Sequence, residues 1–213
     1  MSFLEFERLS YARLREVSAR FLEEHHPDRT LPTPIEEIVE RRLKINIIPV
    51  PGLQGVFAED GPGVEGFLTS DLQDLLVDDW VMMNRPSRYR FTLAHEVGHF
   101  VFHRRIYETH RFNTIDARRA FMNSVSEEDL REVEWQAYAF AGLILVPERA
   151  LKTVVDECVK DAIGRLQVNG LSLKAGWEAA WDFVYESVAK PFEVSAEVIR
   201  RRVDYDRLQD IYR

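Results

Sequence analysis

The segment RFTLAHEVGHFVFH, residues 90–103, contains the pattern His-Glu-x-x-His at positions 95–99. Successive residues of an α-helix are rotated by about 100°, so His95 and His99 lie one turn apart on one face and can bind the same metal ion. Glu96 then lies beside the metal, where its carboxylate can accept a proton from metal-bound water, as in zinc peptidases. A five-residue pattern of this kind also occurs by chance, so the prediction of a metal site depends on further residues elsewhere in the chain.

The composition is that of a folded globular domain. Of the 213 residues, 46% are apolar and 30% are charged, and the sequence has no low-complexity tract or internal repeat. We expect a single zincin-like domain over residues 1–213. It would comprise an N-terminal helix in residues 1–30, the sheet and two site helices in 31–150, and a helical part in 151–213.

Charge and cysteine content limit the possible binding partners and the cellular compartment. The formal net charge of -8 and the pI near 5.3 argue against direct binding to nucleic acid, because such binding needs a basic surface. The single cysteine, Cys158, cannot form an internal disulfide, and no apolar run is long enough for a signal peptide or a membrane helix. We therefore expect a cytoplasmic protein without a membrane partner.

The spacing of apolar residues predicts an α+β fold that is predominantly helical. Three runs rich in β-branched or aliphatic residues, joined by short Gly- and Asp-rich connections, predict an antiparallel sheet of about three strands. These runs are residues 45–50, 64–69 and 75–83. Helical spacing and capping residues predict helices over 3–24, 34–43, 87–105, 124–147, 148–168, 173–189 and 196–212.

Two stretches between these elements carry predictions of their own. The polar residues 108–123 have no clear period, which predicts a mobile loop near the site. Asp78 and Asp79 fall inside the third apolar run, which predicts a solvated face or an edge of that strand.

A catalytic zinc ion normally takes three protein ligands, so one more has to come from outside the pentapeptide. A metzincin would have a histidine where this chain has Arg105. His103 lies about 80° around the helix from His95, too far to share one metal ion with both other histidines. We expect His103 to pack, to form hydrogen bonds or to support the ligands.

A glutamate on the next long helix is the better candidate for the third ligand. Glu132 and Glu134 both qualify by residue type. Glu134 shares the apolar face of Ala137 and Ala141, whereas Glu132 is displaced from it by about 200°. Spacing alone leaves open whether Glu134 is a ligand or an ordinary surface acid.

The chain resembles the ImmA/IrrE family of metallo-endopeptidases over most of its length. The segments that carry the resemblance are PIEEIVE, INIIPVPGL, RFTLAHEVGHFVFH, EWQAYAFAGLILVP and FEVSAEVIRRRV. After HExxH the family has a glutamate, then xxAxxFA and a Leu-rich stretch that ends in proline. This pattern is matched by Glu134, Ala137, Phe140, Ala141 and Pro147. Tyr138 departs from it, because the family usually has asparagine there, and this changes the hydrogen bonding around the site without removing a ligand.

The resemblance implies a zincin-like fold in which a small antiparallel sheet packs on the motif helix. It implies a zinc peptidase in which His95, His99 and Glu134 hold the metal and Glu96 is catalytic, although manganese or iron can replace zinc. It also implies that the protein substrate is a helix-turn-helix repressor or an antitoxin-type DNA-binding protein, whose cleavage relieves repression.

Peptide hydrolysis also needs a group that stabilises negative charge on the scissile carbonyl oxygen. Four side chains near the motif qualify by type, and the sequence does not distinguish among them. They are His103, Tyr107, His110 and Tyr138.

A different function class is a regulatory protein with a structural metal site that binds DNA or a partner through its C-terminal helices. The segment KPFEVSAEVIRRRV has the form of a helix end, a turn and a capped helix that carries Arg200, Arg201 and Arg202. Three consecutive arginines point to different sides of a helix, which favours a helical hairpin that packs on the rest of the protein.

Overall fold

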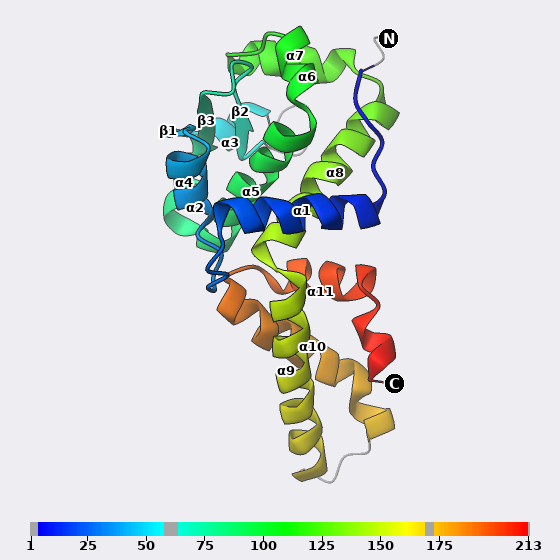
Figure 1. The fold of residues 1–213 in the computed structure, drawn as a ribbon. Coiled ribbons are helices and arrows are strands. Elements are labelled where there is room, and N and C mark those ends of the chain that lie inside the picture. The colour runs from blue at the N-terminus through cyan, green and yellow to red at the C-terminus, as the bar shows by residue number, and fades with distance from the viewer. Residues whose placement is uncertain (1–3, 58–63, 169–172, 213) are drawn as a thin grey trace. The chain divides into compact units, whose positions relative to one another are not determined.

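The computed structural model describes residues 4–57, 64–168 and 173–212, and Figure 1 labels their helices and strands. The chain forms two compact units, residues 1–29 with 34–144 and residues 30–33 with 145–213. The first unit contains the sheet and the HExxH helix, and the described part of the second is helical. The prediction of a mostly helical α+β fold is confirmed. No described helix has the length and apolar character needed to cross a membrane.

The first unit contains the strands, several short helices and two long helices that carry the candidate site. In chain order its elements are α1 (Tyr11–His25), α2 (Ile35–Glu37), the π-helical turn η1 (Ile38–Arg42), β1 (Asn46–Val50), α3 (Leu53–Phe57), β2 (Gly66–Leu68), β3 (Asp74–Asp78), α4 (Asp79–Asn84), α5 (Pro86–Phe102), α6 (Arg104–Thr109), α7 (Ile115–Ser124) and α8 (Glu127–Leu145). The second unit contains α9 (Glu148–Val168), α10 (Leu173–Phe192), α11 (Ala196–Tyr205) and the 3-10 helix η2 (Leu208–Ile211).

The sheet has the strand order β1-β3-β2 and is mixed. β2 pairs antiparallel with β3, with Phe67 opposite Leu76, as the short connection between them predicts. β1 pairs parallel with β3, with Ile48 also opposite Leu76. The prediction of a wholly antiparallel sheet is therefore wrong for this pair. The reason is that α3 and β2 lie between β1 and β3 in the chain. They bring the chain back to the end of the sheet at which β1 begins, so β3 runs in the same direction as β1.

The third strand is shorter than predicted because Asp78 ends it. The Asp78 carboxylate accepts hydrogen bonds from the backbone N–H of Val81 at 3.0 Å and of Gln54 at 2.9 Å. It is the N-cap of α4 and is buried. The prediction that the two acids mark a solvated strand face is therefore wrong, since Asp79 already belongs to the helix that Asp78 caps.

The stretch predicted as a mobile loop is mostly helical. Residues 108 and 109 complete α6, and α7 covers most of the remainder. The Thr114 hydroxyl caps α7 by accepting a hydrogen bond from the N–H of Ala117 at 3.2 Å. The buried rings of Phe112 and Phe121 stack with centroids 4.8 Å apart and hold this segment in the core.

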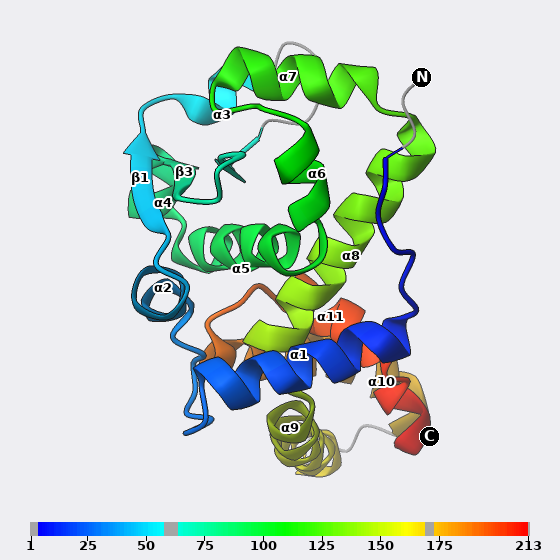
Figure 2. The ribbon, with the colours of Figure 1, turned by 45° about the horizontal axis from the view of Figure 1, so that its top comes forward.

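α5 lies against β2, and it also crosses α8 closely (Figure 2); glycines permit both contacts. A Cβ atom at Gly66 in β2 would lie 2.8 Å from Cγ2 of Thr92 in α5. A Cβ atom at Gly98, inside the HExxH motif, would lie 2.9 Å from Cα of Ala137 in α8. The two site helices therefore approach to backbone contact, one turn away from Glu134.

The second unit is built around α9, α10 and α11. Ser195 caps α11, accepting a hydrogen bond from the N–H of Val198. Each of the three consecutive arginines of α11 forms an ion pair within this unit: Arg200 with Asp182 at 2.9 Å, Arg201 with Glu197 at 2.8 Å, and Arg202 with Asp206 at 3.0 Å.

Candidate metal centre

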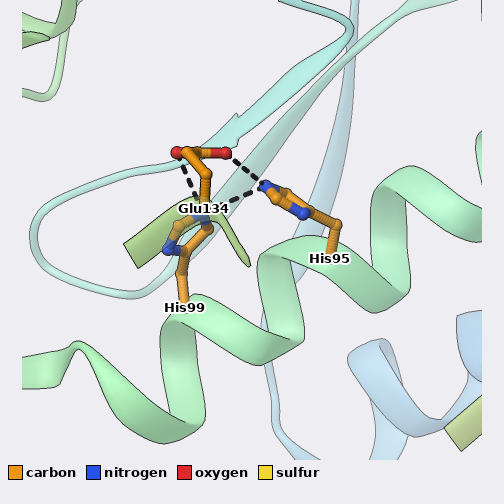
Figure 3. A group of neighbouring side chains, drawn as sticks. All are labelled: His95, His99 and Glu134. Atoms are coloured by element: carbon orange, nitrogen blue, oxygen red, sulfur yellow. Dashed lines mark hydrogen bonds and ion pairs between the residues drawn. The ribbon is translucent and has the colours of Figure 1, made fainter. Parts of the chain in front are cut away.

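His95, His99 and Glu134 converge on one point between α5 and α8. Figure 3 shows both imidazole rings leaving α5 toward the Glu134 carboxylate. The Nε2 atoms of His95 and His99 are 3.0 Å apart, and they lie 3.2 and 3.6 Å from the two carboxylate oxygens of Glu134. One donor atom from each of these residues lies within 4.8 Å of the other two. Of the two glutamates that the sequence left open, Glu134 is the one placed beside the histidines.

The three donors fit a divalent metal ion of the zinc type. Zinc binds imidazole nitrogen at 2.0–2.1 Å with tetrahedral geometry, which separates neighbouring donor atoms by about 3.3 Å. The observed separations of 3.0, 3.2 and 3.6 Å lie on both sides of that value. Two imidazoles and one carboxylate also form a donor set that leaves a fourth position for water.

Two of the three donors, His99 and Glu134, have the charge states that a metal requires, whereas the neighbouring Glu134 raises the pKa of His95 against the effect of burial. Burial lowers the pKa of His99 well below its usual value, which keeps the ring neutral. Burial opposes ionisation of Glu134, but the neighbouring His99 and His95 outweigh it and hold the pKa of this carboxyl below its usual range. A neutral imidazole and an ionised carboxylate are the forms that bind metal.

Glu96 is buried beside the donors and does not join them. Its Oε2 accepts a hydrogen bond from the N–H of Leu68 in β2 at 3.0 Å, and its Oε1 lies 3.9 Å from Nε2 of His95. Burial raises the pKa of Glu96 to about 7. One carboxylate oxygen is thus held by the sheet while the other faces the candidate metal site.

A pocket of about 350 Å³ opens onto this site. The pocket is lined by His95, Glu96 and Glu134, by Gly66 and its neighbours at β2, and by side chains of α5, α7 and α8. Phe91, Met122 and Leu130 give it apolar walls. It has room for a side chain or a short peptide segment next to the two carboxylates.

The pocket also contains a cation that sequence reasoning missed. Arg118 of α7 is only 6% exposed, and its guanidinium lies 4.9 Å from the centroid of the Phe112 ring and 5.6 Å from that of Phe121. Within the described residues it has no carboxylate partner, and its buried Nε has no hydrogen bond. A buried charge without a partner favours negative charge in the pocket that it lines.

The four side chains that the sequence offered for the carbonyl oxygen are not equivalent. Tyr138 lines the pocket, and its ring centroid is 4.5 Å from that of His95. His103 lies on the other side of His99 and contacts its Nδ1. Tyr107 and His110 do not line the pocket; the His110 ring packs on Phe121 at 4.9 Å.

The donor set and the pocket define a candidate metallopeptidase, and the comparison with protein families is more specific. Residues 82–204 match the model of the M78 peptidases, described as an IrrE N-terminal-like domain. This range is more than half of the chain and includes His95, Glu96, His99 and Glu134. The protein therefore belongs to this metallopeptidase family, as the resemblance predicts.

Among solved structures, the chain is similar to a transcriptional regulator from Mycobacterium tuberculosis. The TM-score is 0.51 at 17% sequence identity, over 89% of this chain and 55% of the regulator. At this identity the likeness shows the fold, and the chain spans only about half the length of the regulator. No curated protein matches the chain.

Proposed function

We propose that the protein is a zinc-dependent endopeptidase in which His95, His99 and Glu134 hold the metal. The observation that carries this proposal is the convergence of three donor atoms within 4.8 Å at the wall of a pocket that also contains Glu96. Membership of a metallopeptidase family supports the same function. Manganese or iron would satisfy the same donors, so the choice of zinc as the ion bound in the cell is itself part of the proposal.

In this proposal, the residues around the metal divide the proton transfers and charge stabilisation among them. A bound zinc ion would polarise the scissile carbonyl and lower the pKa of the attacking water toward roughly 7. Glu96 accepts the water proton and delivers it to the leaving amine. The hydrogen bond from Leu68 fixes one carboxylate oxygen, so the other is the one that transfers the proton.

We assign the stabilisation of the carbonyl oxygen to Arg118, with Tyr138 as a second donor. Both line the pocket, and Arg118 is a cation without a carboxylate partner among the described residues. Hydrolysis creates negative charge on the carbonyl oxygen, and a cation already fixed in place stabilises it without reorganisation. The contacts of the Arg118 guanidinium with the Phe112 and Phe121 rings hold it in that fixed position.

We propose that the substrate is a cytoplasmic helix-turn-helix repressor or an antitoxin-type DNA-binding protein, cleaved to relieve repression. Family membership supports a protein substrate. β2 is an edge strand of the sheet, and Gly66 at its start lines the pocket. A substrate segment bound in extended form along this edge would pass the candidate metal site.

Incubation of the zinc-loaded protein with a DNA-binding regulator encoded beside its gene tests this proposal. We expect cleavage of the regulator at one or a few sites, slow cleavage of unfolded casein, and no cleavage by the Glu96→Gln variant. Rapid digestion of casein at many sites with the regulator intact would refute the selective role. Equal cleavage by the Glu96→Gln variant would refute the mechanism.

The alternative, a regulator that binds DNA through its C-terminal helices, draws less support. Arg200, Arg201 and Arg202 each pair with a carboxylate of the same unit, and Arg202 is also buried. Paired arginines offer less charge to a phosphate backbone than free ones. DNA binding that persists after removal of metal would support this alternative.

A further inference from the structure

We propose that His103, Gln136 and the backbone carbonyl of Glu7 form a hydrogen-bonded chain that fixes His99 in the tautomer able to bind metal. This inference rests on the proposed metal site, and it assigns positioning roles to residues that do not bind the metal themselves. The chain starts at a backbone atom near the N-terminus and ends at Nε2 of His99.

The orientation of the Gln136 amide is the first step. Its Nε2 donates to the carbonyl oxygen of Glu7 at 2.9 Å and to a carboxylate oxygen of Glu132 at 3.3 Å. Both partners are acceptors only, so the NH2 group has to face them. The amide oxygen of Gln136 therefore faces the other way, toward Nε2 of His103 at 3.3 Å.

The tautomers of both histidines follow from this orientation. An amide oxygen only accepts, so Nε2 of His103 carries the proton and donates it. His103 is buried, and no carboxylate among the described residues forms an ion pair with it, so a charged ring would have no counter-charge. The ring is therefore neutral, and its Nδ1 is an acceptor. That Nδ1 lies 3.0 Å from Nδ1 of His99. Hence His99 carries its proton on Nδ1 and directs a bare Nε2 toward His95 and Glu134.

The consequence for metal binding is direct. A neutral imidazole can carry its proton on either nitrogen, and a proton on Nε2 of His99 would block the lone pair that faces the candidate site. Hydrogen bonds to the second nitrogen of a ligating histidine fix its tautomer and ring orientation and raise its basicity. Gln136 and His103 provide this for His99.

The N-terminal segment is thereby coupled to the site. Glu7 precedes the range 82–204 that matches the family model, so this support lies outside the matched domain. Arg8 pairs with Glu128 at 3.1 Å and with Asp129 at 3.2 Å in α8, and the Phe6 ring meets the His103 ring edge-on at 6.1 Å. The segment thus contacts α8 and the residue that caps the C-terminus of α5.

The test compares Gln136→Met with two other variants. Gln136→Met keeps the length of the side chain and removes the acceptor for His103, whereas Gln136→Glu retains an acceptor. Gln167→Met makes the same exchange as the first variant at an exposed position of α9. Two quantities are measured on full-length protein: the zinc dissociation constant, by competition with a chromophoric chelator, and the imidazole tautomers of the metal-free protein, by long-range ¹H–¹⁵N NMR.

We expect the wild type to show His99 protonated at Nδ1 and His103 at Nε2, and Gln136→Glu to preserve both. Gln136→Met should mix the tautomers of His99 and weaken zinc binding by about 10- to 100-fold, while Gln167→Met changes neither. A wild-type His99 protonated at Nε2, or wild-type zinc affinity in Gln136→Met, would overturn the inference. If the wild type bound no zinc, the proposed function would fail, and the tautomers would still report on the hydrogen-bonded chain.

Discussion

Gly98→Ala perturbs the contact that brings the two halves of the candidate metal centre together. The added Cβ would lie 2.9 Å from Cα of Ala137 and 3.1 Å from its carbonyl oxygen, whereas ordinary contacts of this kind begin at 3.4 Å. Both obstacles are backbone atoms, so no side-chain rotation relieves the overlap. α5 and α8 have to separate by at least 0.5 Å, which is the difference between 2.9 and 3.4 Å.

This displacement is large on the scale of metal coordination. Glu134 lies one turn before Ala137 and moves with α8, while His95 and His99 stay on α5. Ligand distances in a working metal site hold to about 0.2 Å. We therefore expect zinc affinity to fall by about 10- to 100-fold, as for other losses of support around a metal. Overpacking should also cost about 1–3 kcal/mol of stability.

Zinc competition and thermal unfolding measure both effects, and Gly164→Ala in α9 is the matched control. A Cβ at Gly164 meets nothing within 4 Å, so this variant should bind zinc normally. It should also be more stable by up to about 1 kcal/mol, because alanine favours a helix over glycine. Wild-type zinc affinity and stability in Gly98→Ala would refute the role assigned to this contact.

Three further outcomes follow from the site. Glu96→Gln should retain zinc and lower the cleavage rate by about 10²- to 10⁴-fold, because an amide cannot accept the water proton; unchanged turnover would exclude Glu96 as the base. Arg118→Gln should lower kcat by about 10²- to 10³-fold at constant metal content, with partial recovery in Arg118→Lys. Tyr138→Phe should cause a smaller loss of kcat. Steady-state kinetics on the identified substrate would show whether KM changes instead. Zinc at 100 times its Kd should stabilise the metal-free protein by about 2.7 kcal/mol in thermal unfolding, and no shift in Tm would count against a native site.

The local part of the site could be predicted from the sequence, because helix periodicity alone places His95, Glu96 and His99 together. Glu134 is 35 residues beyond His99, and its position depends on how two helices pack. The position of Glu134 along its helix does not decide whether this residue is a metal ligand or a surface acid. The glycine at 98 and the alanine at 137 make the close contact, and no periodicity in either helix reveals that they face each other.

The features that sequence reasoning missed depend on contacts between distant segments. The parallel pairing of β1 with β3 depends on where the intervening β2 docks, and local propensity carries no information on that choice. The sequence predicts a loop in place of α7 because the buried side of this helix includes Arg118, which breaks the apolar pattern of an amphipathic helix. The Thr114 cap and the spacing of Arg118 and Phe121 were the available signals.

Diffraction data collected on both sides of the zinc absorption edge, from crystals of protein purified without chelator, test the central claim most directly. We expect a single anomalous peak within bonding distance of His95 Nε2, His99 Nε2 and a Glu134 oxygen, with about one zinc per chain by elemental analysis. The His95→Ala, His99→Ala double variant should lose both signals. An anomalous peak elsewhere, or normal metal content in the double variant, would contradict the account.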